Sequence, residues 1–241
     1  MEENKIILNN ILDKYGLNED EKKELISIIK DIFNHKEFQK RMSDNFPHHG
    51  NITLGEHILE VTVVTYILSK KYKDNPNYSL KTALKIAMLH DLYELPWQNN
   101  KEAKTKKLFT KHGFRHPIEA AINANTWYPD LFETNEEEVK IIDGIVHHMF
   151  PFPVSNLEDF SSNKLELKNY DKFMRLSKFK KDIINLSTNK NKLLVISVAR
   201  SSYLEGRVMS RADKIVSKEN FKQTNIFDLI SLLTGHNINL N

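Results

Sequence analysis

The sequence predicts an all-α protein, a helical bundle preceded by an accessory helical hairpin. Only 7 glycines and 7 prolines occur among 241 residues, so the chain has few of the turns that a many-stranded sheet requires. Several stretches carry apolar residues at helical spacing, and many of them begin at a residue type that caps helix N-termini. Long helices with short connections form an all-α domain around one core.

The accessory hairpin is expected within the first 45 residues. Ile7 and Ile11 are spaced as on one face of a first helix. Asn18 then precedes a run of three acidic residues, which suits the N-terminus of a second helix. Leu25 and Ile29 belong to the apolar stripe of that second helix.

The main domain is expected to contain several capped helices. Thr53 and Glu56 form a capping box before one of them, and Thr134 and Glu137 form another. Ser79 caps a helix that is apolar nearly all round. Such a helix is typical of the centre of a bundle.

Three further helices are predicted in the C-terminal part of the chain. Apolar residues indicate a long helix at 193–214, and the intervening polar segment contains a candidate basic helix at 172–184. A last helix is expected after Thr224. We therefore divide the chain into accessory helices at 1–45, a main domain at 46–222 and a C-terminal helix at 223–241 that packs on it.

Composition narrows the classes of function. The 35 basic and 32 acidic residues give a net charge of +3, which is too mild to indicate nucleic-acid binding but suits an anionic substrate. The chain has no cysteine, so disulfides, thiolate metal sites and cysteine nucleophiles are excluded. Neither a secretion signal nor a membrane-spanning run is recognised, and the cytoplasm is the expected location. The sequence does not indicate an oligomeric state.

Histidine and aspartate residues mark the candidate site. His90 and Asp91 follow an almost uninterrupted apolar helix, where a buried carboxylate is costly unless it is paired or bound to a metal. The other candidates, taken singly, are equally well explained as surface or helix-end residues. No local spacing forms a metal site, so the ligands would have to meet by folding. The candidates are His57, His90, Asp91, His116, His147, His148 and Asp213.

The order of these residues resembles the HD superfamily of metal-dependent phosphohydrolases. The matching segments span about residues 50 to 220 and occur in the family's order. They are Gly55-Glu56-His57, Ala87-Met88-Leu89-His90-Asp91 and Ala212-Asp213-Lys214. Two more segments resemble a subgroup of small bacterial HD proteins, namely His112-Gly113-Phe114-Arg115-His116-Pro117 and His148-Met149-Phe150-Pro151.

The resemblance implies a set of metal ligands. One divalent ion would be held by His57, His90, Asp91 and Asp213. The sequence leaves open whether the chain holds one ion or two, and a second ion would share Asp91 and use His116 with His148, for which the adjacent His147 is the alternative. Imidazole and carboxylate ligands suit Zn, Fe, Mn, Co or Ni.

The activity that the resemblance implies is hydrolysis of a phosphomonoester or phosphodiester by metal-activated water. The substrate would be a small phosphorylated compound, with nucleotides as a candidate class. One alternative is a non-catalytic HD module that keeps its metal and senses a nucleotide. Another is an RNA-directed protein that uses the basic residues at 172–181.

Four more residues are candidates for roles around the metals. Glu94 follows Asp91 by three positions, so it would lie on the same side if the helix continued, and proton transfer would be its role. Lys111, Arg115 and Arg211 are candidate phosphate-binding cations. The segment after Glu94, Leu95-Pro96-Trp97-Gln98, lacks an acid and a histidine that the subgroup carries there. This departure puts the substrate and the rate in doubt.

Overall fold

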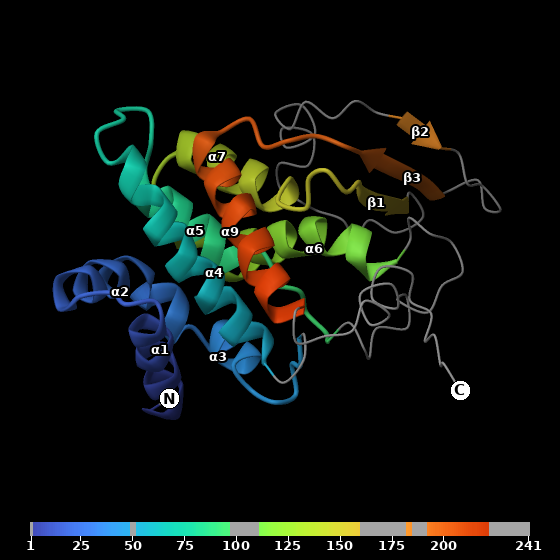
Figure 1. Cartoon of the computed structure of the whole chain (residues 1–241). Coiled ribbons are helices and arrows are strands. Elements are labelled where there is room, and N and C mark those ends of the chain that lie inside the picture. The colour runs from blue at the N-terminus through green and yellow to red at the C-terminus, as the bar shows by residue number, and fades with distance from the viewer. Residues whose placement is uncertain (1, 49–51, 97–110, 160–181, 185–191, 222–241) are drawn as a thin grey trace.

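Helices dominate the computed structural model, which describes residues 2–48, 52–96, 111–159, 182–184 and 192–221 (Figure 1). The predicted all-α class is confirmed, and a small antiparallel sheet accompanies the helices. None of the described helices is both long enough and apolar enough to cross a membrane.

The second N-terminal helix begins at its predicted cap, and a short third helix follows that the sequence did not predict. Asn18 and Glu21 make the two reciprocal hydrogen bonds of a capping box at the second helix. Gly16, with a φ of 70°, makes the left-handed turn that leads into it. The helices are α1 (Glu2–Lys14), α2 (Glu19–Asn34) and α3 (Lys36–Arg41).

Three helices form the centre of the bundle. The helix α4 is buried along nearly its whole length and packs against both of the others. Its N-terminus is closed by the predicted capping box of Thr53 and Glu56. The central helices are α4 (Leu54–Ser69), α5 (Leu80–Leu89) and α9 (Leu204–Phe221).

Two more helices complete the bundle. The helix that begins at His112 packs on the helix that begins at Asn135, and the latter also contacts α5 and α9. They are α6 (His112–Trp127) and α7 (Asn135–Val146). Short 3₁₀ turns follow α4 and α6, namely η1 (Lys70–Tyr72) and η4 (Pro129–Leu131).

One hydrophobic core joins the N-terminal helices to the bundle. Leu12 of α1 and Ile29 of α2 belong to the same cluster of buried side chains as Val61 of α4 and Ile145 of α7. The accessory helices therefore share the core of the main domain instead of forming a separate one.

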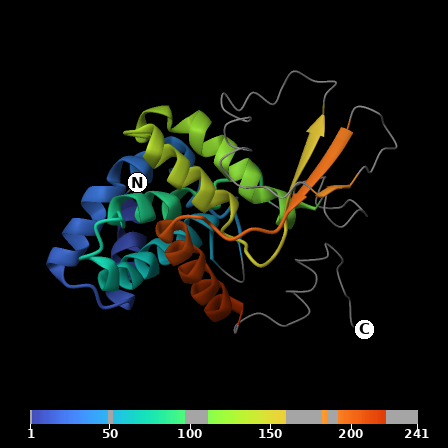
Figure 2. The ribbon, with the colours of Figure 1, turned by 90° about the horizontal axis from the view of Figure 1, so that it is seen from above.

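The small sheet is antiparallel and has the strand order β1-β3-β2. Its first and last paired residues fix the register of β1 on β3, with Val154 opposite Ser197 and Asp159 opposite Lys192. The sheet and the N-terminal helices lie on opposite sides of the bundle (Figure 2). The strands are β1 (Val154–Asp159), β2 (Asp182–Ile184) and β3 (Lys192–Ser197).

The sheet overturns one helix prediction and the end of another. The long helix expected at 193–214 is instead a strand at 192–197 followed by α9. Of the candidate basic helix at 172–184, the structure describes only 182–184, and these residues form β2. The apolar run at 193–196 fits either a strand or a buried helix segment, and pairing with two other strands decides for the strand. The helix expected after Thr224 lies outside the described residues.

Candidate metal centre

Five segments that are distant in the sequence deliver buried histidine and aspartate side chains to one place. His57 lies near the start of α4, and His90 with Asp91 directly follows α5. His116 lies near the start of α6, His148 follows α7, and Asp213 lies in the middle of α9. None of these residues is more than 8% exposed: His57, His90, Asp91, His116, His148 and Asp213.

The first group of possible metal ligands combines His57, His90 and Asp213, whose ligand atoms lie within 4.8 Å of one another. The Oδ1 atom of Asp213 is 3.4 Å from His57 Nε2 and 3.9 Å from His90 Nε2. Ser217, one turn along α9, donates a hydrogen bond of 3.1 Å to the same oxygen of Asp213. Two imidazoles and one carboxylate thus converge on a buried point.

The second group combines Asp91, His116 and His148 within the same distance limit. The Nε2 atoms of the two histidines are only 3.1 Å apart. Asp91 Oδ1 lies 3.2 Å from His116 Nε2 and 3.6 Å from His148 Nε2.

Asp91 stands between the two groups. Its Oδ1 atom faces His116 and His148, whereas its Oδ2 atom is 3.7 Å from His57 Nε2 and 3.6 Å from His90 Nε2. One carboxylate therefore presents one oxygen to each group. This arrangement allows a single side chain to bridge two ions.

Backbone carbonyls fix the orientation of two of the rings. The carbonyl oxygen of Ala87 lies 2.8 Å from His90 Nδ1, and that of Ile145 lies 2.7 Å from His148 Nδ1. A carbonyl can only accept, so Nδ1 carries the proton and Nε2 keeps its lone pair for a metal. This contact is the usual outer support of a metal-binding histidine.

Neighbouring imidazoles and burial shift the pKa values of the two carboxylates in opposite directions. Burial alone would raise the pKa of Asp91, but the neighbouring His90, His116 and His148 hold it well below its ordinary value. The pKa of Asp213 is likewise lowered, because the hydrogen bond from His57 and the nearby imidazoles outweigh its burial. Both carboxylates are therefore ionised at neutral pH, as metal ligands must be.

These residues fit a metal ion. His90 Nε2 is buried and has no hydrogen-bond partner among the described residues. Burial lowers the pKa of His148 to about 3, so this imidazole is neutral and can donate its lone pair to a cation. The Nε2 atoms of His116 and His148 are buried and face each other. A cation bound by both lone pairs would stabilise this arrangement.

The adjacent histidines 147 and 148 have different surroundings. His147 directs Nδ1 to the carbonyl oxygen of Asp143 at 3.0 Å and to its carboxylate Oδ1 at 3.2 Å. None of the possible metal-binding groups within the described residues contains His147. Asp143 Oδ2 also accepts hydrogen bonds from Ser201 Oγ at 2.6 Å and from the Ser202 backbone N–H at 2.8 Å. His147 thus belongs to a buried link between α7 and the start of α9.

Glu94 does not occupy the position expected for it. The helix α5 ends at Leu89, so the condition for placing Glu94 on the same helical side as Asp91 is not met. The Glu94 side chain is exposed, and its backbone N–H donates a 2.8 Å hydrogen bond to Glu119 Oε1.

The three candidate cations differ in position. Lys111 is buried at the N-cap of α6, and Arg115 is partly buried beside His116. Burial lowers the pKa of Arg115 from its ordinary value. Arg211 is exposed, and it precedes Asp213 by two residues, which places it on the opposite side of α9 from that ligand. The structure therefore separates Arg211 from the centre.

Sequence reasoning missed three side chains that surround the ligands. The ring of His48 lies 4.2 Å from that of His57, measured between centroids, and a His48 nitrogen belongs to a possible metal-binding group with His57 and Asp91. Tyr93 packs its ring edge-on against His112, with 4.7 Å between centroids, and His112 lies beside His116. The only sequence signal for His48 was its residue type, whereas His112 begins the segment 112–117 that resembles the small bacterial HD proteins.

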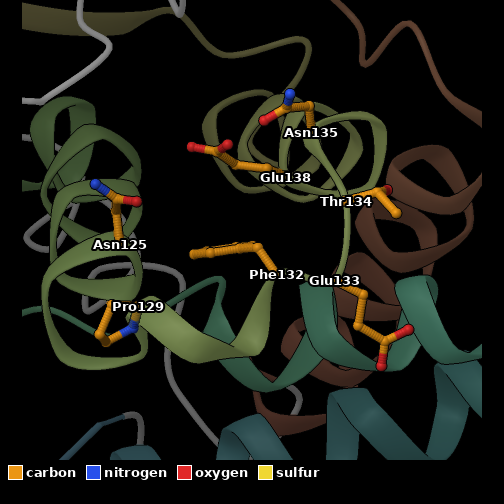
Figure 3. Close-up of a pocket in the computed structure, with 7 residues that line it drawn as sticks. All are labelled: Asn125, Pro129, Phe132, Glu133, Thr134, Asn135 and Glu138. Atoms are coloured by element: carbon orange, nitrogen blue, oxygen red, sulfur yellow. The ribbon is translucent and has the colours of Figure 1, made fainter.

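A separate pocket lies away from the centre. Figure 3 shows it between the C-terminal end of α6 and the N-terminal end of α7, whereas His116 and His148 lie at the opposite ends of these helices. Its lining is mostly polar and includes Glu133 and Glu138. The pocket therefore belongs to a different face of the molecule.

Comparison of the chain with protein-family models, with curated proteins and with solved structures gives no match. The geometry of the centre and the sequence motifs are therefore the basis on which a function is proposed below.

Proposed function

We propose that the chain is a metal-dependent phosphohydrolase of the HD type. The observation that carries the proposal is the position of Asp91, whose two carboxylate oxygens each face a different group of buried imidazoles. A structural ion pair needs one partner and not four. The arrangement instead suits a carboxylate that would bridge two cations.

The proposed centre holds two divalent ions drawn from Fe, Mn, Zn, Co and Ni. The first would be held by His57, His90 and Asp213 and the second by His116 and His148, with Asp91 shared. Ions of this kind make a water nucleophile available at neutral pH and neutralise phosphate oxygens. The backbone contacts of His90 and His148 keep their Nε2 lone pairs directed at the centre.

The proposed substrate is a small phosphomonoester or phosphodiester, with nucleotides as one class to test. Arg115 directly precedes His116 and Lys111 is the N-cap residue of the same helix, and we propose that these two cations attract the phosphate. Glu94 is exposed beyond the end of α5, and we assign no proton transfer to it.

Metal analysis combined with a phosphate-release screen tests the proposal. Protein purified without chelator should contain divalent metal and release phosphate from an aryl phosphate or from nucleotides. His90→Ala and Asp91→Ala should lose both metal and turnover, whereas His116→Ala should lose one ion. The control is His35→Asn, which replaces a histidine at the N-cap of α3 by another capping residue.

Two results would contradict this function. Unchanged metal content in His90→Ala would show that the buried cluster is not a metal site. Metal and nucleotide binding without release of phosphate would instead indicate a sensing module.

A further inference from the structure

His48 is a partly exposed neighbour of the buried candidate ligands. It is contributed by the loop before α4, whereas the metal ligands proposed above come from helices or their ends. The base of this loop is fixed, because the backbone N–H of His48 donates to the carbonyl oxygen of Ile52 at 2.9 Å. Pro47 and Thr53 form a bridge beside that bond.

The distances place His48 within reach of a group bound at the centre. One of its ring nitrogens and the ligand atoms of His57 and Asp91 all lie within 4.8 Å of one another. A phosphate oxygen accepts hydrogen bonds at about 2.7–2.9 Å from a nitrogen donor. A side chain at this position can therefore contact a phosphate group held by the metals.

Stacking argues against His48 as another ligand of the same ion. Its ring lies over that of His57, with centroids 4.2 Å apart and planes tilted by 31°. An imidazole binds metal through a lone pair in the plane of its ring, and stacked rings direct such lone pairs to neighbouring points instead of to one. His57 is also oriented toward Asp213, at 3.4 Å.

The hydroxyl group of Tyr93 orients the His48 ring. It lies 3.4 Å from His48 Nδ1. The backbone of Tyr93 is held in turn, because its carbonyl oxygen accepts hydrogen bonds of 3.1 and 2.6 Å from Nε and Nη2 of the fully buried Arg41. Since Tyr93 follows Asp91 by two residues, the same segment carries the bridging ligand and the support for His48.

We propose that His48 donates a hydrogen bond to the phosphate group of the substrate and that the Tyr93 hydroxyl positions its ring. This inference rests on the proposed function and names a substrate-binding residue for the same site. The family resemblance assigns neither residue a role.

Phosphate binding to the metal-loaded protein tests the inference. The protein is loaded with Mn²⁺, freed of unbound metal, and titrated with inorganic phosphate by calorimetry. His48→Ala should keep its metal and its melting temperature but bind phosphate about ten- to a hundredfold more weakly, as expected for loss of a hydrogen bond to a charged group. His48→Gln keeps a donor on the side chain and should recover part of the affinity.

A double-mutant cycle tests the positioning role of Tyr93. Tyr93→Phe keeps the ring that packs on His112 and should weaken phosphate binding about threefold. In the His48→Ala background the same change should have no effect, because its action passes through His48. An equal effect in both backgrounds would overturn the positioning role. The His35→Asn variant is the control for loss of a histidine elsewhere.

The outcomes separate the two proposals. Loss of metal from His48→Ala, or phosphate affinity equal to that of the original chain, would overturn the role of His48 and leave the hydrolase proposal intact. A chain that binds phosphate through His48 but releases none from any ester would overturn the hydrolase proposal alone.

Discussion

Neighbouring side chains of the same type have different environments in this protein. His148 directs Nε2 toward Asp91 at 3.6 Å, whereas His147 directs Nδ1 toward Asp143 at 3.2 Å. Both residues follow the end of α7 at Val146, and their rings contact different backbone carbonyls, that of Asp143 for His147 and that of Ile145 for His148. A sequence motif that contains both histidines cannot distinguish the candidate ligand from the residue that pairs with Asp143.

The two histidines should respond differently to replacement. We expect His148→Ala to lose one of two bound ions, since its Nε2 atom belongs to the second group. His147→Ala should keep both ions but lower the free energy of unfolding by about 1–3 kcal/mol, because Asp143 would lose a buried partner. Metal analysis and urea unfolding measure the two effects. Loss of an ion from His147→Ala would reverse the assignment.

His112 should make the metal-free protein sensitive to acid. Burial and the nearby His116 lower the pKa of His112 to about 3, against an ordinary value of 6.5. Between these values the unfolded chain binds a proton at this residue and the folded chain does not, so stability falls as the pH falls from about 6.5 to 3. His112→Phe should remove up to about 1.4 kcal/mol per pH unit from that slope.

Urea unfolding at several pH values, in the presence of a chelator, measures the slope. Parallel profiles for the original chain and the His112→Phe variant would contradict the prediction. The comparison uses slopes, so a uniform change in packing from the larger ring does not affect it.

At the scale of elements, the contact between α7 and α9 sets the distance between the two ligand groups. Gly144 and Gly206 face each other, so the two backbones approach closely. Ser210 Oγ of α9 donates a 2.5 Å hydrogen bond to the carbonyl oxygen of His148. This hydrogen bond connects His148 with the helix that carries Asp213.

A methyl group at Gly206 should separate these helices. A Cβ atom there would lie 2.7 Å from the Cα atom of Gly144 and would also overlap the side chain of Ser201. We expect Gly206→Ala to lower the free energy of unfolding by about 1–3 kcal/mol and to weaken metal binding. Gly113→Ala is the matched control, since its Cβ atom would meet nothing within 4 Å in α6. Equal stabilities of the two variants would show that the helix contact is not tight.

At the scale of the whole molecule, the shared core and the candidate metal centre couple the described helices of the fold. The core includes Leu12 of α1 as well as Ile145 of α7. The candidate ligands come from three helices (α4, α6 and α9) and from the residues that follow α5 and α7. Unfolding of one segment therefore disrupts both the core and the centre, and a single cooperative transition is expected.

Metal removal should destabilise the folded chain and change its proton content. An ion that binds only the folded state adds about 4 kcal/mol of stability at a free concentration a thousand times its dissociation constant. Burial disfavours protonation of His57 and His116, but Asp213 and Asp91 respectively outweigh it and raise the pKa of each. Metal binding should therefore release protons from these imidazoles, and fewer as the pH rises.

Thermal melting with and without chelator measures the stabilisation, and calorimetry in buffers of different ionisation enthalpy counts the protons. A melting temperature that does not respond to metal, or a proton count that does not respond to pH, would contradict the prediction.

The sequence alone determined the helical class and the main caps, because these depend on local spacing and residue type. It indicated the candidate ligands through segments that resemble the HD superfamily. Asn18, Thr53 and Ser79 cap the helices predicted for them. It could not predict the strand at 192–197, since a short apolar run fits either structure until its backbone finds partners. Nor could it distinguish His148 from His147 or place His48 beside His57. Only the tertiary structure decides which distant side chains share a buried volume, because that depends on helix ends and crossing helices and not on the order of residues.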